Sequence, residues 1–421
     1  MSLNKTGSFI LVDGTLKSLE GHSYNYDLAV ARAAVAVYQN VTIYADKRLP
    51  SYINPTIPIH RTLNNIPFDW LKQFANRFFE IVSFFTEKSS GLRSGNASVH
   101  SGVPSVFLRY GEYMRAIDFR KSLQLILVAK DELQCDFFIQ HARIGEIFAV
   151  ETIKTHHRFH LVLRHSPELI CNSVEDIVVF ASRLRRISRD NRRHIFFYTD
   201  SALLTEEYQV LTGELFPALP IPILLTAEFV RVGRNNKIPR LSVLGGPRIE
   251  KGFDHLPEII ASLPEGISLA IQISRDTNDS RVIARTKWLD DVACHDSRLT
   301  LLEGPVAESV YFEWFAKTDI LLLPYISPKY ASSTSGVFVE ALYFSSPIIA
   351  IQGTWMAGLI EKAADEGLRI GMVIDSFAQI RDSVRQILDA LPLFHMDMKT
   401  YFARWQQSNN AENIITILKA R

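Results

Sequence analysis

The chain alternates short apolar runs with longer amphipathic segments along most of its length, and this alternation constrains its fold more than any other feature. Each apolar run is too short for a helix and has the composition of a strand that is buried on both faces. The runs lie at 9–12, 41–44, 137–140, 161–163, 195–198, 241–244, 269–273, 299–302, 320–323 and 348–351. Because helical segments separate them, the pattern predicts an α/β fold with parallel sheets.

The strand-like runs fall into two series, which indicates two domains. A chain of 421 residues is long enough for two separate hydrophobic cores. Between the series, residues 225–239 mix proline with polar residues and glycine, as interdomain linkers do. We therefore expect one domain over 1–230 and a second over 237–395, with a helix over 397–421 that packs back on the first domain.

The composition excludes several classes of protein. Lysine and arginine total 46 and aspartate and glutamate 45, so the basic excess that marks a nucleic-acid binder is missing. The three cysteines make no disulfide framework and have no metal-ligating partners at close spacing. The sequence opens without a secretory signal, and no apolar run approaches the length of a membrane span. We expect a cytoplasmic protein that is soluble or peripheral to a membrane.

A phosphate-binding turn is predicted where the strand at 320–323 ends. A hydroxyl-rich loop follows this strand and leads into a helix that begins near Gly336. The N–H groups at such a helix start, together with Ser333, Thr334 and Ser335, suit a diphosphate. Glu340 lies one turn into the helix, where a carboxylate can accept two hydrogen bonds from a ribose diol. The alternative is a simple helix cap with a solvated Glu340.

A second segment, LSVLGGPRIEKG at 241–252, adds positive charge at the end of another strand. Its turn contains Gly246, followed by Arg248 and Lys251 just before a helix expected to begin near Phe253. Arg248 can hold two phosphate oxygens at once and Lys251 supplies a point charge, which suits a departing diphosphate. An isolated motif of this kind could instead be a solvated turn.

In order along the chain, these motifs resemble the retaining glycosyltransferases of family four. The matching segments are GGPRIEKG, TDILLLPY, SGVFVEAL and SSPIIAIQG. The resemblance implies a GT-B fold, in which two Rossmann-like domains face a cleft. It also implies that Arg248 and Lys251 hold the donor diphosphate, that Glu340 holds the ribose, and that the backbone from Ser335 to Val337 holds the distal phosphate.

The resemblance further implies the reaction. A sugar would pass from a nucleoside-diphosphate sugar to a hydroxyl of a saccharide, glycolipid or other acceptor with retained anomeric configuration, and without a metal or other cofactor. Surface polysaccharide or glycan biosynthesis is the expected setting. Many family members carry a further glutamate eight residues before the one that matches Glu340, where this chain has Ser332. An epimerase or phosphorylase on the same fold, and a non-catalytic nucleotide-sugar-binding relative, therefore stay open as alternatives.

Candidate residues in the first half of the chain follow predicted strands, whose carboxyl ends face the ligand in this architecture. Gly21 and His22 form a turn that resembles the loop aimed at the transferred sugar. For His22, a histidine satisfied within the turn is an equally good interpretation. His141 corresponds loosely to the family's histidine or aspartate near the donor sugar. Arg164 and His165 are expected on the acceptor side, where His165 could instead cap the helix that begins at Pro167.

Two features of the sequence are compatible with a peripheral membrane contact. The segment 68–85 is aromatic around much of a helix, and arginines crowd residues 183–193. Both patterns can bind a lipid surface, but a buried aromatic helix and a solvated basic helix surface are the more common outcomes.

Overall fold

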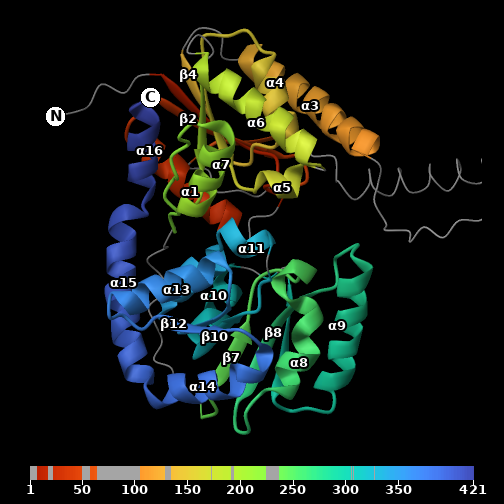
Figure 1. Ribbon diagram of the computed structural model, residues 1–421, viewed down its shortest axis with the longest axis vertical. Helices are drawn as coiled ribbons and strands as arrows, with labels where there is room; N and C mark the ends of the chain where they lie inside the picture. The colour runs from red at the N-terminus through yellow and green to blue at the C-terminus, as the bar shows by residue number, and fades with distance from the viewer. Residues whose placement is uncertain are drawn as a thin grey trace, which may run out of the picture. The chain divides into compact units, whose positions relative to one another are not determined.

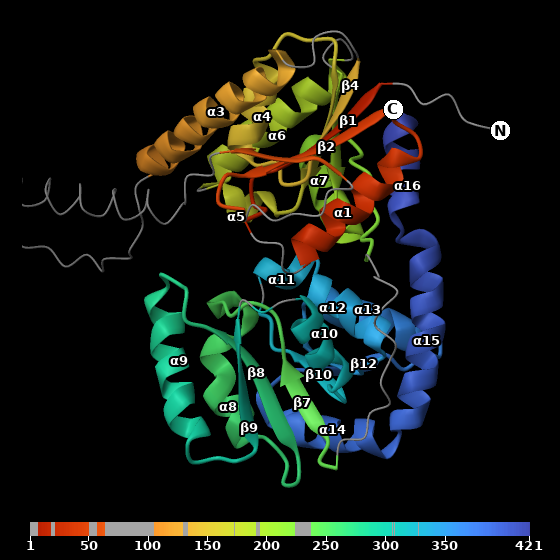
Figure 2. The ribbon, with the colours of Figure 1, turned by 180° about the vertical axis from the view of Figure 1, so that it is seen from behind.

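The computed structural model describes residues 7–17, 22–49, 57–63, 105–128, 134–171, 173–190, 194–223, 237–304, 306, 308–326 and 328–421. Figure 1 shows two α/β bodies, and Figure 2 shows each from behind. Contacts between Cα atoms divide the chain into one unit of Met1–Lys17, Val35–Thr199 and Glu206–Pro217 and a second of Ser18–Ala34, Asp200–Thr205 and Ala218–Arg421. The domain limits expected from the sequence stay a prediction.

The first sheet is six-stranded and entirely parallel, with the strand order β3-β2-β1-β4-β5-β6. Its strands are β1 (Ser8–Asp13), β2 (Asn40–Asp46), β3 (Ile59–Leu63), β4 (Cys135–Ile139), β5 (Arg158–Leu163) and β6 (Ile195–Thr199). The helices in this part of the sequence are α1 (His22–Val35), α3 (Ser105–Val128), α4 (Ile144–Glu151), α5 (Pro167–Ile170), α6 (Val174–Arg189) and α7 (Ala202–Thr212). Helix-containing crossovers join β1 to β2, β3 to β4, β4 to β5 and β5 to β6, as expected for an α/β fold.

The second sheet repeats this arrangement, with the order β12-β11-β10-β7-β8-β9 and parallel pairing throughout. The strands are β7 (Arg240–Val243), β8 (Ser268–Ser274), β9 (Leu299–Gly304), β10 (Ile320–Leu323), β11 (Ile348–Ile351) and β12 (Gly371–Ile374). The helices are α8 (Leu256–Ala261), α9 (Ser280–Ala293), α10 (Glu308–Ala316), α11 (Lys329–Ser332), α12 (Gly336–Phe344), α13 (Trp355–Asp365), α14 (Ile380–Asp389), α15 (Leu391–Ser408) and α16 (Ala411–Lys419), with short 3-10 turns at Ile249–Lys251, Phe253–His255 and Phe377–Gln379. Both sheets have the strand order of a Rossmann-like domain. The predicted α/β class is confirmed.

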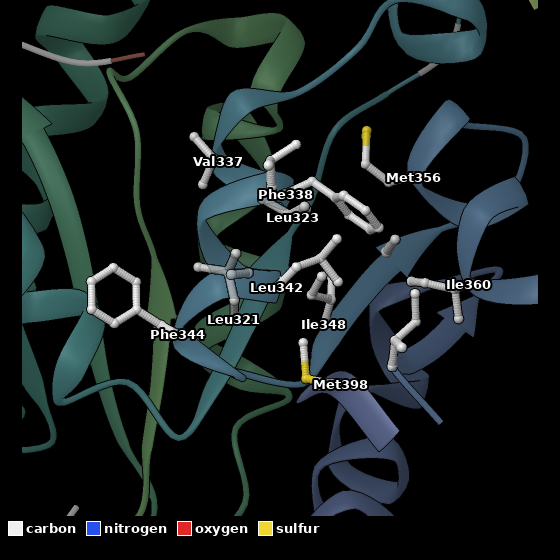
Figure 3. Close-up of a cluster of buried hydrophobic side chains, with 14 of the residues drawn as sticks. Leu321, Leu323, Val337, Phe338, Leu342, Phe344, Ile348, Met356, Ile360 and Met398 are labelled. Atoms are coloured by element: carbon white, nitrogen blue, oxygen red, sulfur yellow. The ribbon is translucent and has the colours of Figure 1, made fainter. Parts of the chain in front are cut away.

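The central strands of the second sheet are buried on both faces, which explains their continuous apolar runs. Leu321 and Leu323 of β10 belong to one hydrophobic cluster with residues of α10, α12, α13 and α15. Ile320 and Leu322 belong to a second cluster with residues of α8, α9 and α14. Figure 3 shows the first cluster, in which Phe338 of α12 lies among side chains from neighbouring elements. Alternate residues of one strand therefore support two helical layers.

The structure also corrects some details of the sequence interpretation. Strands β3 and β12 have no counterpart among the predicted runs, because IHRTL is largely polar and GMVI is short and opens with glycine. The helix expected near Phe253 begins at Leu256, after two 3-10 turns. The end of the chain forms two helices separated at Asn409 and Asn410. Both group with the second unit, and the packing of 397–421 on the first domain stays a prediction.

Among the described residues, no helix is both long and apolar enough to cross a membrane.

Candidate functional site

The candidate site lies where the order of the second sheet reverses. Strands β7 and β10 are neighbours at its centre, and their connections run to opposite sides of the sheet. Ligands of open α/β sheets bind beyond the carboxyl ends of the strands at such a switch point. The loop 244–252 follows β7 and the segment 324–335 follows β10, so both predicted motifs begin at this edge.

Close backbone contact joins the two segments. Gly252 has φ +78° and lies so near the strand end that a Cβ there would be 2.0 Å from the carbonyl oxygen of Pro324. The Ile326 N–H also donates to the carbonyl oxygen of Glu250 at 3.2 Å. Only glycine combines this positive φ with such close approach at no steric cost. The last residue of the GGPRIEKG motif therefore holds the two loops together.

Arg248 and Lys251 lie beside a pair of tyrosines. The Arg248 guanidinium donates to the Tyr330 hydroxyl at 3.4 Å, while the Lys251 Nζ lies 5.3 Å from the centre of the Tyr325 ring. The two tyrosine rings are themselves 4.4 Å apart. Loss of water around the Lys251 ammonium, with repulsion from Arg248, lowers the pKa of Lys251 well below its ordinary value. An anion bound here would offset that repulsion.

Glu250 balances part of this positive charge and also pairs with Lys329. Its carboxylate accepts a hydrogen bond from Lys329 at 2.6 Å and lies 3.8 Å from the Arg248 Nε. Burial acts to raise the pKa of Glu250, but the hydrogen bond from Lys329, a backbone hydrogen bond and the charges of Lys329 and Arg248 together lower the pKa. Glu250 thus stays ionised and keeps both cationic side chains at the edge of the sheet.

The helix start after β10 has the features of an anion site. Ser335 caps α12, because its hydroxyl accepts from the Phe338 N–H at 3.3 Å. Among the described residues, the buried Ser333 hydroxyl has no hydrogen-bond partner. Thr334 differs from its neighbours, since it donates its hydroxyl proton to Asp200 at 2.9 Å. Ser333 is therefore the better placed of these hydroxyls to serve a ligand at the positive end of the helix.

Glu340 is buried rather than solvated, with 2% of its surface exposed. The Tyr311 hydroxyl of α10 donates to its Oε2 at 2.9 Å, and electrostatic interaction couples Glu340 to Lys251. A buried carboxylate with these neighbours is far from the simple solvated helix residue that was the alternative.

Three of the candidates in the first half of the chain lie at the carboxyl edge of the first sheet. The Arg164 Nε donates to the Gln140 carbonyl at 3.0 Å, which brings Arg164 close to the residue that precedes His141. His141 lines a pocket together with Val12, Gly14, Thr15, Leu63, Phe119, Ser122, Ile139, Arg143 and Glu146. This pocket lies beyond β1 and β4, the switch point of the first sheet.

His165 does not cap the helix at Pro167. Ser166 is the N-cap residue, with its hydroxyl accepting from the Glu168 N–H at 3.3 Å. The His165 carbonyl instead accepts from the Tyr208 hydroxyl at 2.9 Å. A serine directly before Pro167 is the stronger capping signal, because its short hydroxyl reaches the first free N–H groups.

The remaining elements that the sequence singled out either lie outside the described residues or form ion pairs within the first unit. Gly21, the side chain of His22 and the aromatic segment 68–85 lie outside the described residues. On α6, Arg183 and Arg186 both pair with Glu151, and Arg189 pairs with Glu214 at 2.6 Å. The arginine-rich helix therefore uses much of its charge in ion pairs within its own unit.

Sequence reasoning missed Tyr311, Tyr325 and Asp200. Tyr311 lies 29 residues before its partner Glu340, and Asp200 lies 134 residues before Thr334. Such pairs share no local spacing, so only the folded chain brings them together. Tyr325 could have been suspected, because it lies two residues after the predicted strand at 320–323.

Comparison of the fold with solved structures identifies its class as GT-B, with two Rossmann-like domains. The chain is similar to sucrose-phosphate synthase from Thermosynechococcus elongatus, with TM-score 0.63, 12% identity and 98% of each chain covered. It is also similar to WaaG, a glycosyltransferase involved in lipopolysaccharide biosynthesis, with TM-score 0.62, 14% identity and coverage of 97% of this chain and 99% of WaaG. HepE from Anabaena in complex with UDP-glucose matches with TM-score 0.60, 9% identity and 98% of each chain covered.

Neither a protein-family profile nor an individual curated protein matches the sequence significantly. The similarity is therefore one of fold, and the expected GT-B architecture is confirmed at that level.

Proposed function

We propose that the chain is a glycosyltransferase that moves a sugar from a nucleoside-diphosphate sugar to a hydroxyl acceptor. The observation that carries the proposal is the convergence of Arg248, Lys251 and the start of α12 on one sheet edge, with the buried Glu340 in the same helix. Similar folds occur in HepE structures that contain UDP or UDP-glucose. A saccharide or glycolipid acceptor, and a setting in surface polysaccharide or glycan biosynthesis inside the cell, complete the proposal.

In this proposal Glu340 accepts hydrogen bonds from the ribose diol, and the diphosphate lies against the amides at Gly336 and Val337 and the Ser333 hydroxyl. Gly246, exposed in the turn after β7, leaves room for the donor to approach the backbone. Thr334 acts indirectly, by holding the loop to Asp200.

The chemical difficulty of the reaction is the negative charge that develops on the leaving diphosphate. Arg248, Lys251 and the positive end of α12 stabilise that charge while the bond to the sugar breaks, as preorganised electrostatics does elsewhere. We propose that these groups replace a metal ion and that the anomeric configuration is retained. Loss of Arg248 should lower turnover about 100-fold, the usual effect of removing one such donor.

The residues of the first sheet are assigned to the sugar and acceptor. His141 is proposed to approach the transferred sugar together with the Gly21 and His22 turn, and Arg164 and His165 to contribute to the acceptor side. A peripheral membrane contact belongs to the proposal only through the acceptor, which could be a glycolipid.

The first test is binding of UDP, GDP, ADP and TDP in the absence of metal, followed by thermal shift. We expect one of them to raise the melting temperature of the wild-type protein and of Glu361→Ala, a control at an exposed position on α13. The same nucleotide should stabilise Glu340→Gln much less, because the amide nitrogen replaces one carboxylate oxygen and cannot accept a hydrogen bond from a ribose hydroxyl.

Transfer assays with the corresponding nucleotide sugars then distinguish between the possible reactions. Acceptor-dependent release of the nucleoside diphosphate supports the transferase, whereas epimerisation or phosphate-dependent cleavage without an acceptor indicates the other enzymes of this fold. Binding without turnover would indicate a non-catalytic relative, an outcome for which Ser332 gives a specific reason. No stabilisation of a folded protein by any nucleotide would refute the proposed donor site.

A further inference from the structure

Glu340 accepts a hydrogen bond from a tyrosine of a different helix. The Tyr311 hydroxyl of α10 donates to the Glu340 Oε2 at 2.9 Å, and α10 packs directly against α12. Glu340 is 2% exposed, so this hydrogen bond forms where water competes little and contributes strongly to the orientation of the carboxylate.

The Tyr311 ring is fixed by neighbouring aromatic rings. It meets Phe315 edge-on at 5.2 Å between ring centres, and Phe315 stacks on Phe344 of α12 at 5.3 Å. Phe312 of α10 also contacts Phe344, with their ring centres 5.6 Å apart. The aromatic contacts therefore set the distance between the two helices that carry the tyrosine and the carboxylate.

The Tyr311 hydroxyl remains the donor in its hydrogen bond to Glu340 over the physiological pH range. Burial, followed by the nearby charge of Glu340, raises the pKa of Tyr311 well above its ordinary value. Tyr311 therefore remains protonated and donates to the carboxylate. A carboxylate has about four acceptor positions, so the bond from Tyr311 helps to fix its plane and is compatible with hydrogen bonds from both hydroxyls of a diol.

We propose that Tyr311 is a positioning residue for ribose recognition, which orients Glu340 toward the two ribose hydroxyls of the donor nucleotide. This inference rests on the proposed function and adds the group that makes the site selective for ribose over deoxyribose. Without Tyr311 the carboxylate keeps its charge but loses its fixed orientation, and it must also be desolvated again each time a nucleotide binds.

The test compares the nucleoside diphosphate that the wild-type protein binds with its 2′-deoxy counterpart, by calorimetry or fluorescence titration. We expect the wild type to prefer the ribonucleotide. Tyr311→Phe should weaken ribonucleotide binding about tenfold, with a much smaller effect on the deoxynucleotide. Tyr401→Phe, which removes a hydroxyl from a buried tyrosine of α15, serves as the matched control and should keep the wild-type preference.

A double variant tests whether Tyr311 acts through Glu340. If it does, Tyr311→Phe combined with Glu340→Gln should bind the ribonucleotide about as well as Glu340→Gln alone, because the second change removes nothing further. Independent, multiplying losses would overturn the inference. The melting temperature of each free variant shows whether folding has changed.

The remaining outcomes separate this inference from the proposed function. Failure of the wild type to bind any nucleoside diphosphate would refute the proposed function, and the inference with it. A wild type that prefers ribose, with an unchanged preference in Tyr311→Phe, would refute only the role of Tyr311. An equal loss of both nucleotides in Tyr311→Phe would show a merely structural role and would also overturn the inference.

Discussion

Gly252 illustrates how a single residue can bring two loops of the site together. Its φ is +78°, and a Cβ at this position would lie 2.0 Å from the Pro324 carbonyl oxygen, which leaves no space for another side chain. Gly266 shares the positive φ, at +74°, but a Cβ there meets nothing within 4 Å. The two positions therefore separate the cost of the backbone conformation from the cost of the close contact.

We predict that Gly266→Ala lowers the free energy of unfolding by about 1 kcal/mol, the cost of a positive φ in a residue with a side chain. Gly252→Ala should cost several times as much, because the backbone must also move away from Pro324. Urea unfolding followed by circular dichroism measures both. Equal effects of the two substitutions would contradict the close contact between the loops.

A buried charge cluster in the first unit should make the free energy of unfolding depend on pH in the acidic range. Asp136 of β4 accepts from the Tyr38 hydroxyl at 2.5 Å and from Arg158 at 2.5 Å, and His160 lies 3.7 Å away. Burial acts to raise the pKa of the Asp136 carboxyl. The nearby His160, together with hydrogen bonds from Arg158 and Tyr38, outweighs burial and holds the pKa of Asp136 well below the ordinary value.

Because the folded pKa of Asp136 is lower than the unfolded one, its stabilising contribution is present above about pH 4 and is lost as the pH falls toward the folded value. We predict that Asp136→Asn is less stable than the wild type at pH 7 and that this difference in the free energy of unfolding narrows only as the pH falls below about 4. Urea unfolding at several pH values measures it. Asp389→Asn, at an exposed position of α14, should show the wild-type acid dependence, and the same dependence in Asp136→Asn would contradict the prediction.

At the residue scale, the sequence indicated the charged members of the candidate site but not the residues that contact them. Arg248, Lys251 and Glu340 could be proposed because each has a characteristic distance from a strand end or helix start. Tyr311 and Asp200 could not, since their partners are far away in the sequence. Which residues support a site depends on the three-dimensional packing, and local sequence patterns do not encode that packing.

At the scale of elements, α12 links stability to the proposed ligand. Ser335 caps this helix through the Phe338 N–H, and its buried apolar face contributes to the cluster in Figure 3. The cap satisfies one N–H and leaves others at the helix start available to an anion. The same serine thus orders the helix and borders the proposed phosphate position.

We predict that Ser335→Ala lowers the free energy of unfolding by about 1 kcal/mol, the usual cost of losing a serine cap, and that it also weakens nucleoside diphosphate binding. Ser173→Ala is the matched control, because Ser173 caps α6 in the same way through the Asp176 N–H at 3.1 Å. The control should lose similar stability and keep the affinity. If both variants keep wild-type affinity, the start of α12 takes no part in binding.

At the scale of the whole molecule, ligand binding should affect the two sheets unequally. The proposed diphosphate and ribose contacts all belong to the second unit, in segments 244–252 and 324–344. A ligand that binds only the folded state stabilises it by mass action, and the protection is greatest in the segments that it contacts.

We predict that a saturating nucleoside diphosphate slows hydrogen exchange in peptides that cover 244–252 and 324–344, measured by mass spectrometry. Peptides that contain β4 and β5, where the Asp136 cluster lies, should change little and act as the internal control. Protection confined to the first sheet would place the nucleotide elsewhere and contradict the site.

The sequence by itself determined the class of fold and the strands with continuous apolar runs, and it indicated the two candidate ligand-binding motifs of the second half. These follow from local chemistry, because burial on both faces requires an unbroken apolar strand and an anion site requires free N–H groups and cations. Only the tertiary structure decided that β7 and β10 are neighbours, that Gly252 joins their loops and that Tyr311 holds Glu340. The physical reason is that strand order and packing between helices bring together residues whose separation along the chain carries no signal.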